Sequence, residues 1–242
     1  LSKIGDVLRA QGDGAAALES YRNSLAIAEK LAAADPRNTE WQRDLWVSFN
    51  SIGDVLRAQS DGAAALESYR AGLAIVEKLA AAAPRNASWQ RDLSMSFASI
   101  GDVLAAQGNG AAALDSYRKG LAIAERLAAA DSGNAVWQRD LSASYNNIGD
   151  VLAAQGNGAA ALANYRNGLA IAEWQRDLIV SNVKLAEVAT EARDLAIARQ
   201  HYEEALRIAQ GLASDGRLAP VDAWMPGDLQ RRIEALTKQI GG

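Results

Sequence analysis

His201 is the only histidine in the sequence, so it is the first residue to consider for catalysis or metal binding. A catalytic triad or a histidine-based metal site also needs nucleophilic or metal-ligating partners, and the sequence shows none that accompany it. Cysteine is absent, which excludes disulfides and thiolate metal sites. His201 precedes Tyr202 in a helical pattern, so we expect it at a half-exposed helix position. The sequence therefore predicts a protein that is not an enzyme, with no catalytic residue, no metal and no cofactor.

A glycine pattern that begins at Gly12 and recurs at Gly108 and Gly156 is a second candidate. Residues 12–17 fit the dinucleotide-binding fingerprint Gly-x-Gly-x-x-Gly/Ala, which binds phosphate only where it follows a β-strand. Here a helical pattern precedes it, and the turn recurs in the chain. We therefore interpret the pattern as a turn between helices, in which Gly ends one helix and Asp or Asn caps the next.

The third candidate is a row of acidic and amide side chains at equivalent positions of a repeated segment. Asp follows the glycine of Ile-Gly-Asp-Val-Leu in four copies, and Glu follows an alanine in a fifth, degenerate copy. Asparagines lie about one helical turn earlier. The row consists of Asp6, Asp54, Asp102, Asp150 and Glu187, with Asn50, Asn146 and Asn147. This charge pattern suits a basic or polar ligand.

Arginines near this row predict which of its acidic residues are neutralised. Arg9 follows Asp6 by three residues, which is salt-bridge spacing on a helix, and Arg57 has the same spacing in the next copy. Alanines stand at the corresponding positions of the two later copies. We therefore expect the acidic residues of the first two copies to be paired within their own helices, whereas Asp102 and Asp150 have no Arg at that spacing.

These residues belong to a repeat of 48 residues. The segment Ile-Gly-Asp-Val-Leu begins at Ile4, Ile52, Ile100 and Ile148. The segment Trp-Gln-Arg-Asp begins at Trp41, Trp89, Trp137 and Trp174, with spacings of 48, 48 and 37 residues. Residues 4–51 and 52–99 differ at only ten positions, so we infer that the repeats arose by duplication.

Each repeat contains two helical stretches. Apolar residues between Trp41 and Leu56 recur at steps of three or four, and those between Leu66 and Leu79 do the same. The second stretch ends before a proline such as Pro36, and an asparagine then caps the next helix. No segment has the pattern of a strand. We predict helices over residues 15–34, 39–59, 63–82, 87–107 and 111–130.

The pattern resembles the tetratricopeptide repeat, in which Trp-x-x-Leu-Gly-x-x-Tyr is followed by Ala-x-x-x-Phe and then by Pro. Residues 49–56 match the first part and residues 65–69 the second, and segments 97–117 and 145–165 repeat the match. The longer repeat is similar to those of kinesin light chains and of many bacterial tetratricopeptide proteins. The resemblance implies that small residues lie where two helices approach closely and that an aromatic ring fills the gap beside them.

The resemblance covers nearly the whole chain and implies an all-α fold, a right-handed α-solenoid of antiparallel helix hairpins. We expect a single solenoid over residues 1–242. Its repeats are predicted at about 1–36, 37–84, 85–132, 133–173 and 174–214. A capping helix at about 227–240 is expected to cover the stacking face of the last repeat.

The resemblance also implies a function: a non-enzymatic scaffold that binds a peptide or a partner protein in its concave groove. The first helices line that groove in the family, which would place the acidic row against the ligand. Duplication would equally have copied the aspartates without any binding role. An alternative function is a sensing or autoinhibitory arm of a larger signalling protein whose effector domain lies outside this chain.

The net charge of −4 and the pI near 5.2 argue against a nucleic-acid partner, which usually meets a basic surface. No apolar run is long enough to cross a bilayer, so we expect no membrane partner. The lack of cysteine fits a cytoplasmic location. The chain opens at Leu1 without Met, partway through a helical pattern, so we expect a fragment that self-associates end to end through Ile4 and Leu8 of its truncated helix.

The last spacing, of 37 residues, is shorter because Trp174 directly follows Glu173. The residues that form a helix end, a turn and a helix start in the other repeats are missing there. Three alternatives are open. The chain forms an unsignalled tight turn, or helix continues from about Ala159 to Glu191, or a loop exists there that the printed sequence omits. A continuous helix would be roughly 50 Å long and would favour a swapped dimer.

Overall fold

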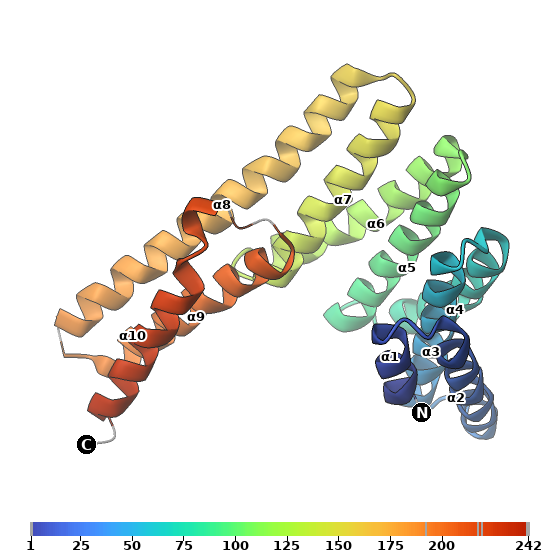
Figure 1. Ribbon diagram of the computed structural model, residues 1–242, viewed down its shortest axis with the longest axis horizontal. Coiled ribbons are helices and arrows are strands. Elements are labelled where there is room, and N and C mark those ends of the chain that lie inside the picture. Colours follow the sequence, from blue (N-terminus) through green and yellow to red (C-terminus); the bar gives the residue numbers. More distant parts are fainter. Residues whose placement is uncertain (1, 192, 217, 219, 241–242) are drawn as a thin grey trace. The chain divides into compact units, whose positions relative to one another are not determined.

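The computed structural model describes residues 2–191, 193–216, 218 and 220–240 (Figure 1). These residues form helices and turns and contain no strand. The helices are α1 (Ser2–Ala10), α2 (Gly14–Ala34), α3 (Thr39–Ala58), α4 (Gly62–Ala82), α5 (Ala87–Ala106), α6 (Gly110–Ala130), α7 (Ala135–Ala154), α8 (Gly158–Glu191), α9 (Leu195–Ser214) and α10 (Met225–Ile240), with a short 3-10 turn at Pro220–Asp222. The five predicted helices correspond to α2 through α6, and each end differs by at most one residue.

The glycine pattern forms turns between helices, as predicted. Gly12 has a φ of +83°, in the left-handed region that ends a helix without steric cost. The side chain of Asp13 then accepts a hydrogen bond from the backbone N–H of Ala16 at 3.0 Å and caps α2. Gly108 and Gly156 repeat the left-handed conformation. The first motif therefore joins two helices and lacks the strand that dinucleotide binding requires.

The predicted asparagine caps are also present. Asn38 Oδ1 accepts from the backbone N–H groups of Glu40 and Trp41, both at 3.1 Å, at the start of α3. Asn86 Oδ1 accepts from the N–H of Trp89 at 3.2 Å, at the start of α5. These bonds satisfy donors that the first turn of a helix leaves without an intrahelical partner. Local residues therefore decide where each helix begins.

A glycine and a tyrosine make the close approach within each hairpin. A Cβ atom added to Gly53 would lie 2.6 Å from Cε1 of Tyr69, and one added to Gly101 would lie 2.5 Å from Cε1 of Tyr117. Tyr69 is fully buried. The prediction that an aromatic ring fills the gap beside a small residue is confirmed. Glycine at these positions offsets its helix cost of about 1 kcal/mol by allowing the ring to pack.

The Trp-Gln-Arg-Asp segments connect successive repeats. Arg43 Nε donates to Asp92 Oδ2 at 2.9 Å, and the Asp92 side chain is only 7% exposed. Trp46 Nε1, one turn further along α3, donates to Ser96 Oγ of α5 at 2.8 Å. Gln90 Nε2 donates to the carbonyl oxygen of Ala80 near the end of α4. Figure 1 shows α2 to α5 running back and forth side by side, which is the arrangement that these bonds require.

The chain divides into two compact blocks. The N-terminal block comprises Leu1–Leu127 with Asn147–Leu162, and the C-terminal block comprises Ala128–Asn146 with Ala163–Gly242. The core of the N-terminal block consists of the buried tyrosines and the aliphatic residues around them. In the C-terminal block, α9 and α10 bury an apolar cluster that includes Tyr202, Ile208, Leu229 and Leu236.

α8 runs unbroken from Gly158 to Glu191, so the structure follows the continuous-helix alternative at the 37-residue spacing. The tight turn is therefore wrong, and no loop separates Glu173 from Trp174 in this helix. The physical reason is the lack of Gly, Pro or Asn near residues 173–177 to end a helix. The side chains of residues 172–175 lie outside those described, and the swapped dimer stays a prediction.

Candidate functional site

The acidic row of the N-terminal block is bonded to the tyrosines that pack against the hairpin glycines. The hydroxyl of Tyr21 donates to Asp6 Oδ1, that of Tyr69 to Asp54 Oδ1, and that of Tyr117 to Asp102 Oδ1, each at 2.7 Å. Each pair is 15 residues apart and joins the two helices of one hairpin. The sequence carried a signal for this contact, because the Asp always follows the glycine that the tyrosine covers, but our sequence analysis missed it.

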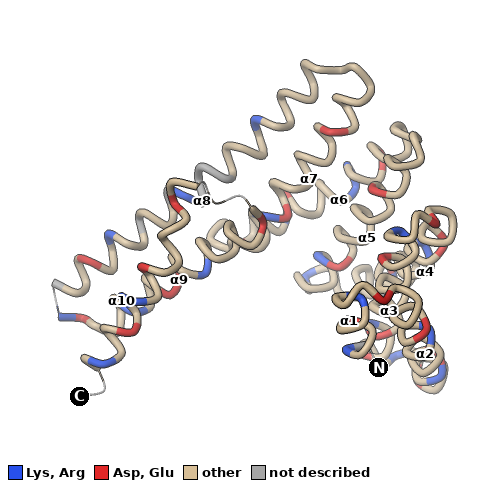
Figure 2. Tube along the Cα trace, viewed as in Figure 1, with Lys and Arg blue, Asp and Glu red and all other residues tan. Residues whose placement is uncertain are grey.

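The arginines of the row pair between repeats, so the expected pairing within one helix is wrong. Arg9 Nη1 donates to Asp54 Oδ2 of the next repeat at 3.2 Å. Arg57 Nη1 lies 3.9 Å from Asp102 Oδ2 of the repeat after that. Asp102 therefore has an arginine partner, contrary to the prediction. The physical reason is that the first helix of the next repeat lies within reach of each long arginine side chain. Figure 2 shows the acidic and basic positions of α1, α3 and α5.

Burial and these hydrogen bonds shift pKa values among the bonded tyrosines and aspartates. Desolvation and the bond to Asp6 raise the pKa of Tyr21 to about 12. Burial also raises the pKa of Asp102 above its usual value, against the opposing effects of the Tyr117 hydroxyl and Arg57. The charged form of Asp102 is thus costly where it stands, and a cation beside it would lower that cost.

A cleft of about 520 Å³ lies within the N-terminal block, between α5, the start of α6 and the second half of α7. Asp102 and Asp150 are its acidic residues. Polar lining comes from Tyr117, Asn147 and Gln155, and apolar lining from Ala105, Val151 and Ala154. Among the described residues, no Lys or Arg lines it. Its volume is in the range of ligand pockets, which is roughly 300–1,000 Å³.

Two of the predicted asparagines lie inside hairpins. Asn50 Nδ2 donates to the carbonyl oxygen of Trp46 at 2.9 Å and faces Gly72 of α4. Asn146 faces Gly168 of α8 within the C-terminal block. Both are packed against the second helix of their own hairpin. Of the three predicted asparagines, Asn147 lines the cleft.

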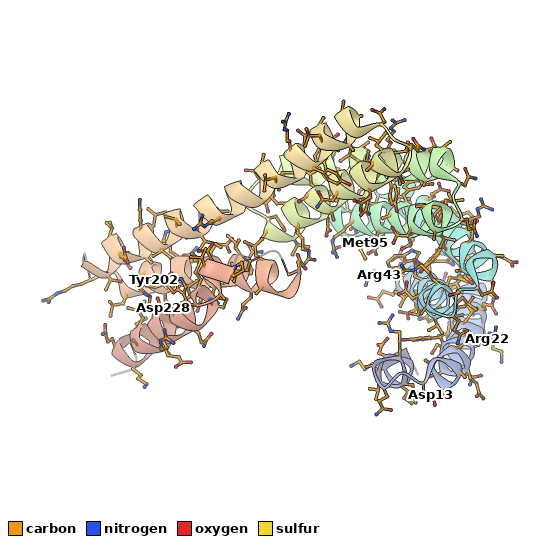
Figure 3. All side chains as sticks on the ribbon, turned by 45° about the horizontal axis from the view of Figure 1, so that its top comes forward. Asp13, Arg22, Arg43, Met95, Tyr202 and Asp228 are labelled. Atoms are coloured by element: carbon orange, nitrogen blue, oxygen red, sulfur yellow. The ribbon has the colours of Figure 1, made fainter. Side chains whose placement is uncertain are left out.

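Glu187 lies in the C-terminal block and pairs with the terminal helix. Arg232 Nη1 donates to Glu187 Oε1 at 3.1 Å and to the hydroxyl of Tyr202 at 3.2 Å. Arg232 Nε donates to Asp228 Oδ2 at 2.7 Å, which lowers the pKa of Asp228. Figure 3 labels Tyr202 and Asp228 beside each other in this block. A hollow of about 290 Å³ adjoins them, lined largely by apolar residues such as Ile179, Val183, Trp224, Met225 and Leu229.

His201 is half-buried on α9, as expected for a helix position. Its Nδ1 lies 2.9 Å from Asn182 Oδ1 of α8, so the ring is held by an amide of the same hairpin. Among the described residues, no group of three or more His, Cys, Asp or Glu side chains is placed to hold a metal ion.

A family model described as "Tetratricopeptide repeat" matches residues 1–37, 93–132 and 141–173. The chain contains tetratricopeptide repeats in these segments. The matched segments include three of the four Gly-Asp positions with their tyrosines, and they agree with the antiparallel hairpins seen in the structure. Tetratricopeptide repeats are in general protein–protein interaction modules and are typically not catalytic. A comparison with curated proteins finds no match.

Two solved structures illustrate the shared fold of this tetratricopeptide-repeat chain. The crystal structure of BtubC (BKLC) from P. vanneervenii is 18% identical, with a TM-score of 0.51 over 93% of this chain and 83% of that one. The apo form of RapI is 15% identical, with a TM-score of 0.58 over 99% of this chain and 82% of that one. At these identities the likeness concerns the fold alone. None of the helices described is long and apolar enough to span a membrane.

Proposed function

We propose that this chain is a non-enzymatic scaffold that docks a peptide or a partner protein along the first helices of its N-terminal block. The cleft at Asp102 and Asp150 is the observation that carries the proposal. It offers a ligand a recess with polar side chains on rigid helices, and repeat proteins of this architecture use such extended surfaces for binding.

The chemistry of the cleft favours a basic or polar segment. Its two carboxylates repel a peptide that presents a terminal carboxylate, because the described lining of the cleft contains no Lys or Arg to receive one. Asn147 and Gln155 supply amide groups that can donate to and accept from a peptide backbone. The chain's net charge of −4 adds a favourable field for a cationic partner.

The test replaces the two acids by their amides. Asp102→Asn with Asp150→Asn removes both charges, yet the amide oxygen of Asn at position 102 can still accept the Tyr117 hydroxyl. A lysine at position 102 would remove that acceptor, so replacement by lysine tests the charge less cleanly than replacement by asparagine. Proteins captured by the wild-type chain would be identified by mass spectrometry, purified and titrated against both forms. We expect affinity to fall by about tenfold or more in the double variant, and binding to weaken with salt.

Asp13→Asn with Asp61→Asn is the matched control. It removes the same charge from two helix caps, at positions where the later repeats carry Asn109 and Asn157. The fold therefore tolerates the change. Equal affinity of the wild type and the Asp102/Asp150 variant, with helicity unchanged by circular dichroism, would contradict the proposal. Equal loss in both double variants would show that only net charge matters.

A further inference from the structure

The junctions between successive first helices supply an internal precedent for a guanidinium site. At the first junction, Arg9 of α1 reaches Asp54 of α3, which lies 45 residues later. At the second, Arg57 of α3 reaches Asp102 of α5 at the same separation. Each junction thus combines an arginine from one repeat with an aspartate from the next.

The third junction has the aspartate but lacks the arginine. Ala105 stands on α5 where Arg9 and Arg57 stand on their helices, and Asp150 lies 45 residues beyond it on α7. Alanine ends at Cβ, and the cleft of about 520 Å³ is lined by both Ala105 and Asp150. The space that an arginine fills at the earlier junctions is therefore part of a cleft at this one.

Asp150 has a bonding partner within the chain, and Asp54 shows that an aspartate of this row can accept a guanidinium in addition to such a partner. Asp54 accepts the Tyr69 hydroxyl on Oδ1 and Arg9 on Oδ2 at the same time. A second carboxylate, Asp102, lines the same cleft and adds negative charge there, beside its existing contacts with the Tyr117 hydroxyl and Arg57.

We propose that this cleft is a guanidinium subsite, which takes the side chain of an arginine presented by a partner protein. The guanidinium occupies the place beside Asp150 that Arg9 occupies beside Asp54. The methylenes of the guest arginine lie along Ala105, Val151 and Ala154, which give the cleft its apolar lining. Arginine is preferred to lysine, since its planar fork of donors matches a carboxylate and its charge is more weakly hydrated. That the guest arginine belongs to a partner protein rests on the proposed scaffold function.

The probe is the tripeptide acetyl-Gly-Arg-Gly-amide, titrated into the whole chain and followed by the backbone amide signals of residues 105, 147 and 150 in NMR spectra. The same tripeptides with citrulline and with lysine serve as comparisons. We expect the arginine peptide to bind about tenfold more tightly than the citrulline peptide, which has the same shape without the charge, and more tightly than the lysine peptide. Equal binding of the arginine and citrulline peptides would overturn the proposal.

Ala105→Arg is the decisive variant, because it restores the residue that the earlier repeats carry. Its side chain should pair with Asp150 and block the cleft, reducing affinity for the arginine peptide by about tenfold or more. Ala106→Arg is the matched control, with the same added charge one position away on an exposed face of α5. Unchanged binding in Ala105→Arg, or equal losses in the two variants, would contradict a specific subsite. Asp150→Asn provides a second test that adds no bulk and should also weaken binding.

The results separate this subsite from the proposed scaffold function. If Ala105→Arg blocks the tripeptide but leaves the captured partner's affinity unchanged, the subsite stands and the partner docks elsewhere. If the partner is lost from the Asp102/Asp150 amide variant while the tripeptide binds the wild type and Ala105→Arg equally, the scaffold function stands and the subsite is wrong.

Discussion

The two blocks of this protein hold a tyrosine in the same place of the hairpin, but its hydroxyl has different partners in each. In the N-terminal block the Tyr69 hydroxyl donates to one carboxylate oxygen of Asp54, and Arg9 of the preceding repeat donates to the other. In the C-terminal block the Tyr202 hydroxyl accepts from Arg232, which comes from the terminal helix α10. The copied repeats thus bond to one another, while the last hairpin bonds to the terminal helix α10.

The blocks also differ at the residue beneath the tyrosine. The copied repeats have glycine there, whereas the degenerate repeat has Ala186, which is fully buried. The copied hairpins approach so closely that a Cβ at Gly101 would overlap the ring of Tyr117. The comparison indicates that duplicated repeats preserve a tighter packing than the chain end requires.

The largest expected effect comes from filling this close approach. Gly101→Leu should lower the free energy of unfolding by about 3 kcal/mol, because the added side chain must displace the Tyr117 ring and the helices around it. Urea denaturation would measure the change. Ala106→Leu, on an exposed position of the same helix, should change stability by less than about 0.5 kcal/mol. Unchanged melting of the Gly101 variant would show that the packing is loose.

A smaller effect should distinguish the two tyrosine bonds. Tyr69→Phe removes the donor from a charged acceptor and should cost about 2 kcal/mol. Tyr202→Phe should cost less than about 1 kcal/mol, since Arg232 keeps Glu187 and Asp228 as partners. Denaturation of the two single variants, with the urea dependence compared to detect changes in compactness, would check this order. A reversed order would contradict the contrast between the blocks.

The stability gained by relieving backbone strain should be smaller than these two effects and similar in both blocks. Ser60 and Arg193 have positive φ angles of 63° and 61°, in turns where Gly12, Gly108 and Gly156 serve in the other repeats. Ser60→Gly and Arg193→Gly should each raise stability by about 0.5–1 kcal/mol, because glycine adopts this conformation without steric cost. Calorimetric melting would measure it. A loss of stability in either variant would mean that the side chain contributes more than the strain costs.

The smallest expected effect is electrostatic and has opposite signs in the two blocks. Burial raises the pKa of Asp102 above its ordinary value of 3.8, so its contribution to stability is full below that pH and is lost as pH rises through its folded pKa. Arg232 lowers the pKa of Asp228 below 3.8, so its contribution is full above that pH and is lost as pH falls through its folded pKa. Carboxyl NMR titration should place the two midpoints on opposite sides of 3.8.

The sequence by itself determined where the helices begin and end. Gly12, Asp13 and Asn38 act on backbone groups a few residues away, so their effects do not depend on the rest of the fold. The period of the repeat and the glycine–tyrosine spacing likewise predicted the hairpin packing. The run of α8 past Glu173 follows the same logic, because no local signal ends it.

Only the tertiary structure decided which polar groups meet. The spacing of Asp6 and Arg9 along one helix predicted a local pair, yet Arg9 bonds to Asp54 because the next first helix brings that carboxylate within 3.2 Å. Asn50 shows the same dependence on packing, since its amide bonds to the Trp46 carbonyl oxygen and lies against Gly72 of the second helix of its hairpin. A side chain several bonds long can reach more than one neighbour, and periodicity does not say which neighbour the packing places there. The cleft beside Ala105 has the same origin: the missing arginine is visible in the sequence, but the space that it leaves depends on how α5 and α7 pack.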